Sequence, residues 1–138
     1  MPVEERSLRR VRRWAAEHLR RWDMADLVND AEVVLTELLT NAVQAGSTRI
    51  TVAIEPCGGP DAVEVAVWDD APGTPRLLEP DFEHERGRGL FMVDALSLEW
   101  GHHEIAISPN STGKVVWAVV GRRTPAEYIE GSAHHGQA

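Results

Sequence analysis

Two polar side chains stand at helical spacing inside an apolar segment of the chain. Glu37 and Asn41 are four residues apart, so on a helix they share one side. Counted at 100° per residue, the pair falls at the rim of the apolar arc around Leu38. On its own, such a pair is typical of a solvated helix edge. At the border of a packed face, however, a carboxylate and an amide can also point into a crevice.

A further acidic residue stands where an alternating apolar run ends. Asp69 is followed by Asp70, Ala71, Pro72 and Gly73, which are residues typical of a turn. Taken alone, Asp69 most simply begins that turn. A carboxylate can also accept a hydrogen bond from the amino group of adenine, which guanine lacks at that position. Asp69 is therefore a candidate for selecting a base.

A short glycine motif, Gly87-Arg88-Gly89-Leu90, directly opens a predicted helix. Glycines let the backbone approach a ligand closely, and a helix N-terminus offers free N–H groups and partial positive charge. Phosphates suit such a place. The motif is also common at ordinary loop-to-helix junctions, and it is not a P-loop, because no Gly-Lys-Ser/Thr follows it.

The elements that position these residues follow from the hydrophobic periodicity. Helical spacing predicts helices over about 5–22 and over a second segment that Asp23 or Asp26 caps and Gly46 ends. A period of two predicts neighbouring antiparallel strands in 50–54 and 63–67. A third helix is predicted from Gly89 to about Leu98, followed by strands around 99–108 and 114–120. The aperiodic segment between Asp69 and this helix is as long as loops that cover a site.

This order predicts an α+β fold, a two-layer α/β sandwich with helices on one face of a mostly antiparallel sheet. We expect a single domain over residues 1–125 and a disordered tail over 126–138. The sequence has no apolar run of transmembrane length, no signal peptide pattern and one cysteine, Cys57, so we expect a cytoplasmic protein.

The charge is unevenly distributed along the chain. The net charge of -8 disfavours direct binding to nucleic acid, although residues 1–21 hold seven arginines against three glutamates. Those arginines fall on the predicted amphipathic helix, where a solvated face explains them. Trp14 and Trp22 lie on the same helix and could serve a dimer, a protein partner or the core. We expect at least one of them to pack inside.

Taken together and in this order, the motifs resemble the GHKL superfamily of ATPases, whose fold is also called the Bergerat fold. The matching segments are 37–42 (N box), 69–73 (G1 box), 87–90 (G2 box) and 113–117 in the last strand. The resemblance extends to the RsbW/SpoIIAB-like anti-sigma factor serine kinases, in particular the short actinobacterial ATP-binding proteins.

The resemblance implies a role for each candidate residue and two ligands, ATP and Mg²⁺. Asn41 would bind the Mg²⁺ that bridges the phosphates, and Glu37 would be the general base. Asp69 would hold the adenine amino group, with Gly73 keeping the loop close to the base. The residues that would wrap the phosphates are Gly87, Arg88, Gly89 and Leu90.

The resemblance also implies a function, an anti-sigma factor that phosphorylates a STAS-type anti-anti-sigma partner on serine, and it allows for a homodimer. One alternative is an ATP-gated binding module without significant kinase activity. Another is a detached histidine-kinase ATPase domain, although the helical hairpin of those kinases is missing here. Three departures from the family pattern leave turnover open. Ala45 stands where many relatives carry histidine, and Ala71 replaces the usual first glycine of the G1 box. Val115 replaces a threonine, which removes a hydroxyl near the Asp69 carboxylate.

Overall fold

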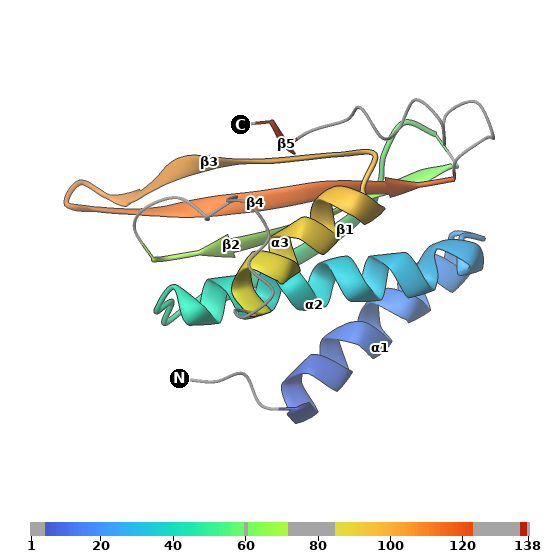
Figure 1. Ribbon diagram of the computed structural model, residues 1–138, viewed down its shortest axis with the longest axis horizontal. Coiled ribbons are helices and arrows are strands. Elements are labelled where there is room, and N and C mark those ends of the chain that lie inside the picture. Colours follow the sequence, from blue (N-terminus) through green and yellow to red (C-terminus); the bar gives the residue numbers. More distant parts are fainter. Residues whose placement is uncertain (1–4, 60, 72–84, 123–135, 138) are drawn as a thin grey trace.

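The computed structural model describes residues 5–59, 61–71, 85–122 and 136–137, with the backbone alone for 5, 85–90 and 136–137. The helices are α1 (Glu5–Arg21), the short 3-10 helix η1 (Ala25–Leu27), α2 (Val28–Gln44) and α3 (Glu85–Leu96). The strands are β1 (Ile50–Pro56), β2 (Ala62–Asp69), β3 (Glu99–Ser108), β4 (Ser111–Gly121) and β5 (Gly136–Gln137). The predicted α+β sandwich is confirmed, with the helices gathered on one face of the sheet (Figure 1).

The sheet has the strand order β1-β2-β4-β3-β5, and all its pairs are antiparallel except β3 with β5. The two predicted hairpins, β1–β2 and β3–β4, are both present. Gly136 and Gln137 form the short edge strand β5, inside the segment expected to be a disordered tail. The preceding residues 123–135 lie outside the described part of the chain.

The core lies between the sheet and the helices. Along β2 and β4 every second residue faces inward, as the pleat of a strand requires. Six of these inward residues are apolar and fully buried: Val63, Val65, Val67, Val116, Ala118 and Val120. From β3, the buried Trp100 joins them, and its indole N–H donates a hydrogen bond to Asp94 of α3 over 2.9 Å. A buried indole N–H needs such an acceptor, so this bond ties α3 to the sheet.

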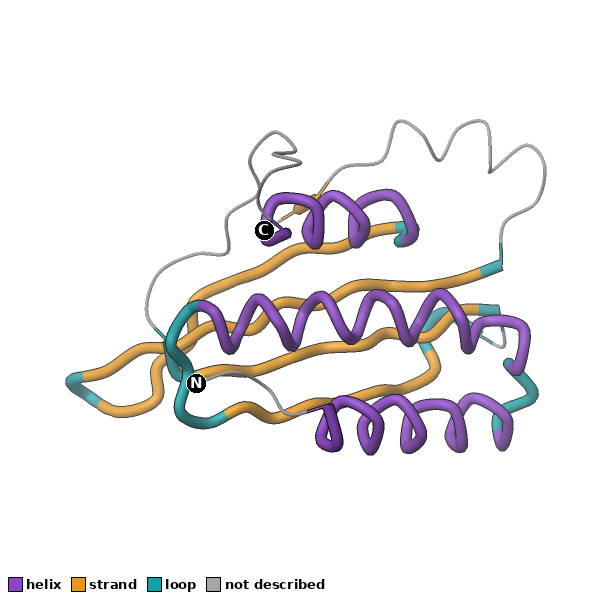
Figure 2. Tube along the Cα trace, turned by 60° about the horizontal axis from the view of Figure 1, so that its bottom comes forward, coloured by secondary structure: helices purple, strands orange, loops and turns teal. Residues whose placement is uncertain are grey.

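The helices α1 and α2 form an antiparallel pair that runs along the strands (Figure 2). On α1, His18 stands between Trp14 and Trp22, with ring centroids 5.2 and 5.3 Å apart. Trp22 packs against the core, as expected for at least one of the two tryptophans. Trp14 instead lines a surface pocket between α1 and β1 with Arg10, Val11 and Val52. Within the described ranges, no helix is long and apolar enough to cross a membrane.

The predicted cap of α2 is wrong. Its N-cap residue is Leu27, and no side chain caps the helix. Asp26 lies in η1, where its carboxylate accepts two hydrogen bonds from Arg122, at 2.6 and 2.8 Å. The competing partner comes from just beyond the end of β4, so the neighbouring sequence could not reveal it. Gly46, with φ of 90°, follows α2 as predicted.

Candidate functional site

The predicted site residues that the structure describes gather at one end of the molecule. There α2 ends, β2 ends and α3 begins, as the left side of Figure 1 shows. The helices α2 and α3 are in contact, and α2 also contacts β2. Asn41, in the last turn of α2, is only 5% exposed. Glu37, one turn earlier on the same side, is half-buried and interacts with another group of the protein.

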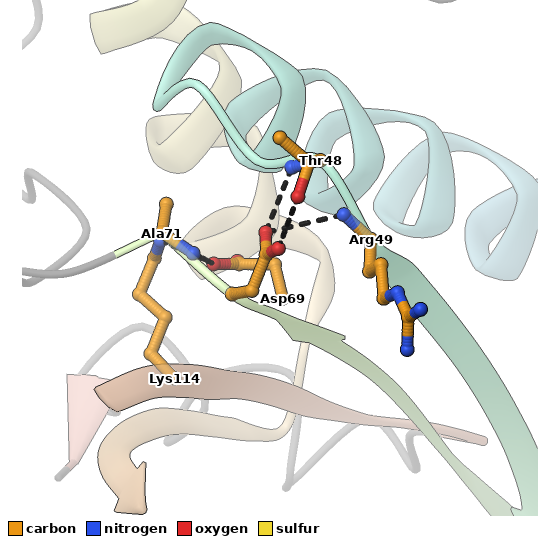
Figure 3. Close-up of polar contacts among 6 residues, drawn as sticks. Thr48, Arg49, Asp69, Ala71 and Lys114 are labelled. Atoms are coloured by element: carbon orange, nitrogen blue, oxygen red, sulfur yellow. Dashed lines mark hydrogen bonds and ion pairs between the residues drawn. The ribbon is translucent and has the colours of Figure 1, made fainter. Parts of the chain in front are cut away.

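Asp69 ends β2 and is buried, with 3% of its surface exposed. Its two oxygens differ in their surroundings. Oδ1 accepts a hydrogen bond from the Ala71 amide and an ion-paired one from the Lys114 ammonium, both over 2.9 Å (Figure 3). Oδ2 is buried without a hydrogen-bond partner among the described residues. A buried acceptor of this kind costs free energy unless a donor completes it, so Asp69 is suited to take one from a ligand.

Lys114 belongs to this candidate site, although the sequence alone did not single it out. It is the only lysine in the sequence and is 2% exposed. In the sheet it stands directly opposite Asp69. A sequence signal did exist, because Lys114 is in phase with the inward residues Val116, Ala118 and Val120.

The role expected for Val115 is wrong. Its lack of a hydroxyl was expected to matter beside the Asp69 carboxylate. In the structure Val115 pairs with Trp68, so it lies on the opposite face of the sheet from Asp69 and Lys114. The side chain of β4 that contacts the Asp69 carboxylate is therefore that of Lys114.

Gly113 allows β4 to pass very close to Asp69. A Cβ atom at this position would stand 2.1 Å from the backbone oxygen of Asp69 and 3.0 Å from the Cα of Asp70. Both neighbours are backbone atoms, which cannot move aside as a flexible side chain can. Glycine is therefore required here because of close packing, and it brings Lys114 within reach of the carboxylate.

Asp70 fixes the chain that leaves α2. Its carboxylate accepts hydrogen bonds from the Thr48 amide at 2.7 Å, the Arg49 amide at 3.1 Å and the Thr48 hydroxyl. The bond from the Thr48 hydroxyl, followed by those from the two amides, lowers the pKa of Asp70 from 3.8 to about 2. Asp70 thus ties the segment between α2 and β1 to the end of β2, next to Asp69.

The glycine motif is not the loop that the sequence predicted. The helix α3 begins at Glu85, so Gly87, Arg88, Gly89 and Leu90 belong to its first turns. In a helix that starts there, the amides from about Gly89 onward bond to carbonyls within the helix. The amides free for an anion are therefore those of residues 85–88. The side chains of 85–90, Gly73 and the rest of the predicted covering loop over 72–84 lie outside the described part.

A family model described as a histidine kinase-like ATPase domain matches residues 1–120 of the chain. The match covers α1 through most of β4, and so includes Glu37, Asn41, Asp69 and Lys114. No curated protein and no solved structure matches the chain significantly.

Proposed function

The chain belongs to the histidine kinase-like ATPase domain family, which implies that it binds ATP. From this membership we propose that it is a Mg-ATP-binding regulatory protein, an anti-sigma factor that phosphorylates a STAS-type anti-anti-sigma protein on serine. The observation that carries the proposal is the buried Asp69, whose Oδ2 has no partner among the described residues, at the end where α2 stops and α3 starts.

Base recognition is the role proposed for Asp69. Adenine carries an exocyclic amino group, which is a hydrogen-bond donor, and the Oδ2 of Asp69, unpaired within the described residues, is an acceptor. A purine with a 6-oxo group would place an acceptor against this acceptor. The site is thus suited to adenine and excludes guanine.

The phosphates and the metal are proposed to lie between α2 and α3. The amide oxygen of Asn41 is a hard ligand of the kind that Mg²⁺ prefers. The free amides of residues 85–88 and the partial positive charge of the α3 N-terminus suit anionic phosphates. When bound, Mg²⁺ would offset phosphate charge during phosphoryl transfer. The donor set fits this ligand.

Glu37 is the proposed general base. It stands one helical turn before Asn41, so its carboxylate would be presented to a serine hydroxyl of the partner beside the terminal phosphate.

A second candidate function is an ATP-gated binding module without significant kinase activity. Ala71 favours it, because this residue replaces the glycine expected from the GHKL resemblance. Ala71 is buried, and its amide binds Asp69 directly. Its methyl group therefore takes up space next to the carboxylate proposed to bind the base. We expect this to slow turnover without disturbing the fold.

The test is phosphoryl transfer from Mg-ATP to STAS proteins encoded in the same genome, read as phosphoserine by mass spectrometry. We expect Glu37→Gln to lower transfer by about a hundredfold or more while ATP affinity stays close to that of the parent chain. Glu32→Gln is the matched control, because Glu32 lies on the same helix but on another side. We expect it to retain transfer.

Two other outcomes would contradict the kinase proposal. If no partner is phosphorylated but ATP binds and changes the affinity for a partner, the chain is the gated module. If neither ATP nor its Mg²⁺ complex binds, and Asn41→Ala changes nothing, the proposal for this site is wrong as a whole.

A further inference from the structure

The two oxygens of Asp69 are not equivalent, and the difference comes from two separate parts of the chain. The Ala71 amide reaches Oδ1 from two residues away, as part of the local turn. The Lys114 ammonium reaches the same oxygen from β4. Two donors therefore converge on Oδ1. Oδ2 is left buried without a partner among the described residues, and we call it the open acceptor in this sense.

Lys114 contributes the stronger of the two interactions. A bond between an ammonium and a carboxylate is charge-assisted, and it is typically about twice as strong as a bond between neutral groups. Both side chains are buried, at 2% and 1% exposure, so water does not screen the pair. The register of β2 and β4 fixes the Lys114 backbone opposite Asp69. The direction of the carboxylate is thus set by the sheet as well as by the turn.

We propose that Lys114 is a specificity-determining positioning residue for the nucleotide base. By binding Oδ1, it fixes where the open acceptor of Asp69 stands, and this acceptor selects a purine with a 6-amino group. The inference rests on the proposed ATP binding at this site, and it adds the residue that controls the choice of base.

An asparagine at position 69 exposes the role of Lys114. Its side chain has one oxygen and one NH₂ group, which are not interchangeable. Because Lys114 and the Ala71 amide both donate to the Oδ1 position, the asparagine oxygen must occupy it. The NH₂ group then replaces the open acceptor with a donor. Such a site prefers a 6-oxo purine, and Lys114 is the main reason that the amide cannot flip.

The experiment compares ATP with inosine 5′-triphosphate, which carries a 6-oxo group in place of the amino group. Affinities are measured by calorimetry on the full chain. The parent chain should prefer ATP by about tenfold or more, because the wrong base leaves an acceptor unpaired. Asp69→Asn should invert this preference. Asp69→Asn/Lys114→Met should lose most of the inversion, because only the Ala71 amide then orients the asparagine.

Asp69→Asn leaves the buried Lys114 ammonium without its anion, and this variant can fail to fold. Two double variants that are uncharged at both positions cover that case. Asp69→Asn/Lys114→Gln keeps an N–H donor at position 114, and Asp69→Asn/Lys114→Met does not. Both lack the ion pair, and melting curves show that both are folded before binding is measured. We expect only the glutamine variant to prefer the 6-oxo base.

Equal base preferences with and without a donor at position 114 would overturn the inference and leave ATP binding standing. Absence of ATP binding by the parent chain is a different result. It overturns the proposed function, and the inference about Lys114 falls with it.

Discussion

Asp69 and Asp70 are adjacent acidic residues that do different work. Asp69 is buried and shares one oxygen between Ala71 and Lys114. Asp70 is half-buried and holds the first residues of the chain after α2. Successive residues of a strand point in opposite directions, so the end of β2 can present one carboxylate to the site and use the next as a brace.

The brace made by Asp70 has a defined pH dependence. Its folded-state pKa, about 2, lies below the ordinary value of 3.8, so its contribution to stability is present above 3.8 and is lost as the pH falls towards 2. We expect Asp70→Asn to be less stable than the parent chain at neutral pH. The difference should shrink through this window in urea unfolding followed at a series of pH values. A difference that stays constant down to pH of about 2 would contradict the role of the charge.

Gly113 is the glycine whose replacement should damage the site most directly. We expect Gly113→Ala to lower the free energy of unfolding by about 1–3 kcal/mol, since its Cβ would collide with the Asp69 backbone. ATP affinity should fall as well, because Asp69 must move. Gly121→Ala is the control on the same strand. Its Cβ would stand 2.6 Å from the flexible end of Leu98 and 3.1 Å from the Asp61 backbone oxygen, far from Asp69. It should leave ATP affinity unchanged, and equal losses in both variants would show that the effect is not local.

The site was only partly predictable from sequence. Asn41 could be proposed because it stands with Glu37 at the rim of the apolar arc of its helix, and Asp69 because it ends an alternating apolar run. Lys114 could not be matched to Asp69, because the pairing of β2 with β4 joins segments that are distant in sequence. The start of α3 was placed too late because glycine weakens the helical signal, although the helix includes Gly87 and Gly89.

Among the elements, the end of β4 is joined to two distant turns by Arg122. Its guanidinium donates to both oxygens of Asp26, to Asp61 at 2.8 Å and to the backbone oxygen of Asp23 at 3.0 Å. These hydrogen bonds lower the pKa of Asp26 and raise that of Arg122. The network therefore connects the α1–α2 junction and the β1–β2 turn to the sheet.

Replacing Arg122 should loosen this end of the fold without affecting the site. We expect Arg122→Gln to lower the melting temperature by a few degrees at low ionic strength, and by less in high salt, because the network is partly exposed and screened. Arg20→Gln, at an exposed position of α1, is the charge-matched control and should change little. ATP affinity should be the same in all three proteins. A salt-independent loss would show that packing, rather than charge, is what Arg122 contributes.

The elements themselves were predicted more completely than the contacts between them. α1, α2 and the first four strands follow from periodicities of 3.6 and 2, which depend only on local sequence. The wrong cap of α2 has the same origin as the missed Lys114. In both cases a side chain was claimed by a partner from β4 or just after it, and only the folded topology brings that partner near.

At the scale of the whole molecule, the two ends of the sandwich differ. One end carries Asp69 and Lys114, which face each other across β2 and β4, whereas Arg122 follows the other end of β4. The strands between them are long and regularly paired, so the site rests on a rigid frame. Changes at the Arg122 end should alter global stability, and changes at the Asp69 end should alter ligand binding.

Because the single lysine is buried, the rate at which it reacts with a reagent reports how often the fold opens locally. An amine-reactive reagent can modify just two kinds of group in this sequence, the terminal amine and Lys114. The first is expected to react at once, and the second only when β4 and β2 separate transiently. The lag between the first and second adducts in intact-mass spectra then measures how often the Asp69 end of the sheet opens. Asp69→Asn should shorten that lag, and equal reaction rates in the parent chain would mean that the lysine is not buried in solution.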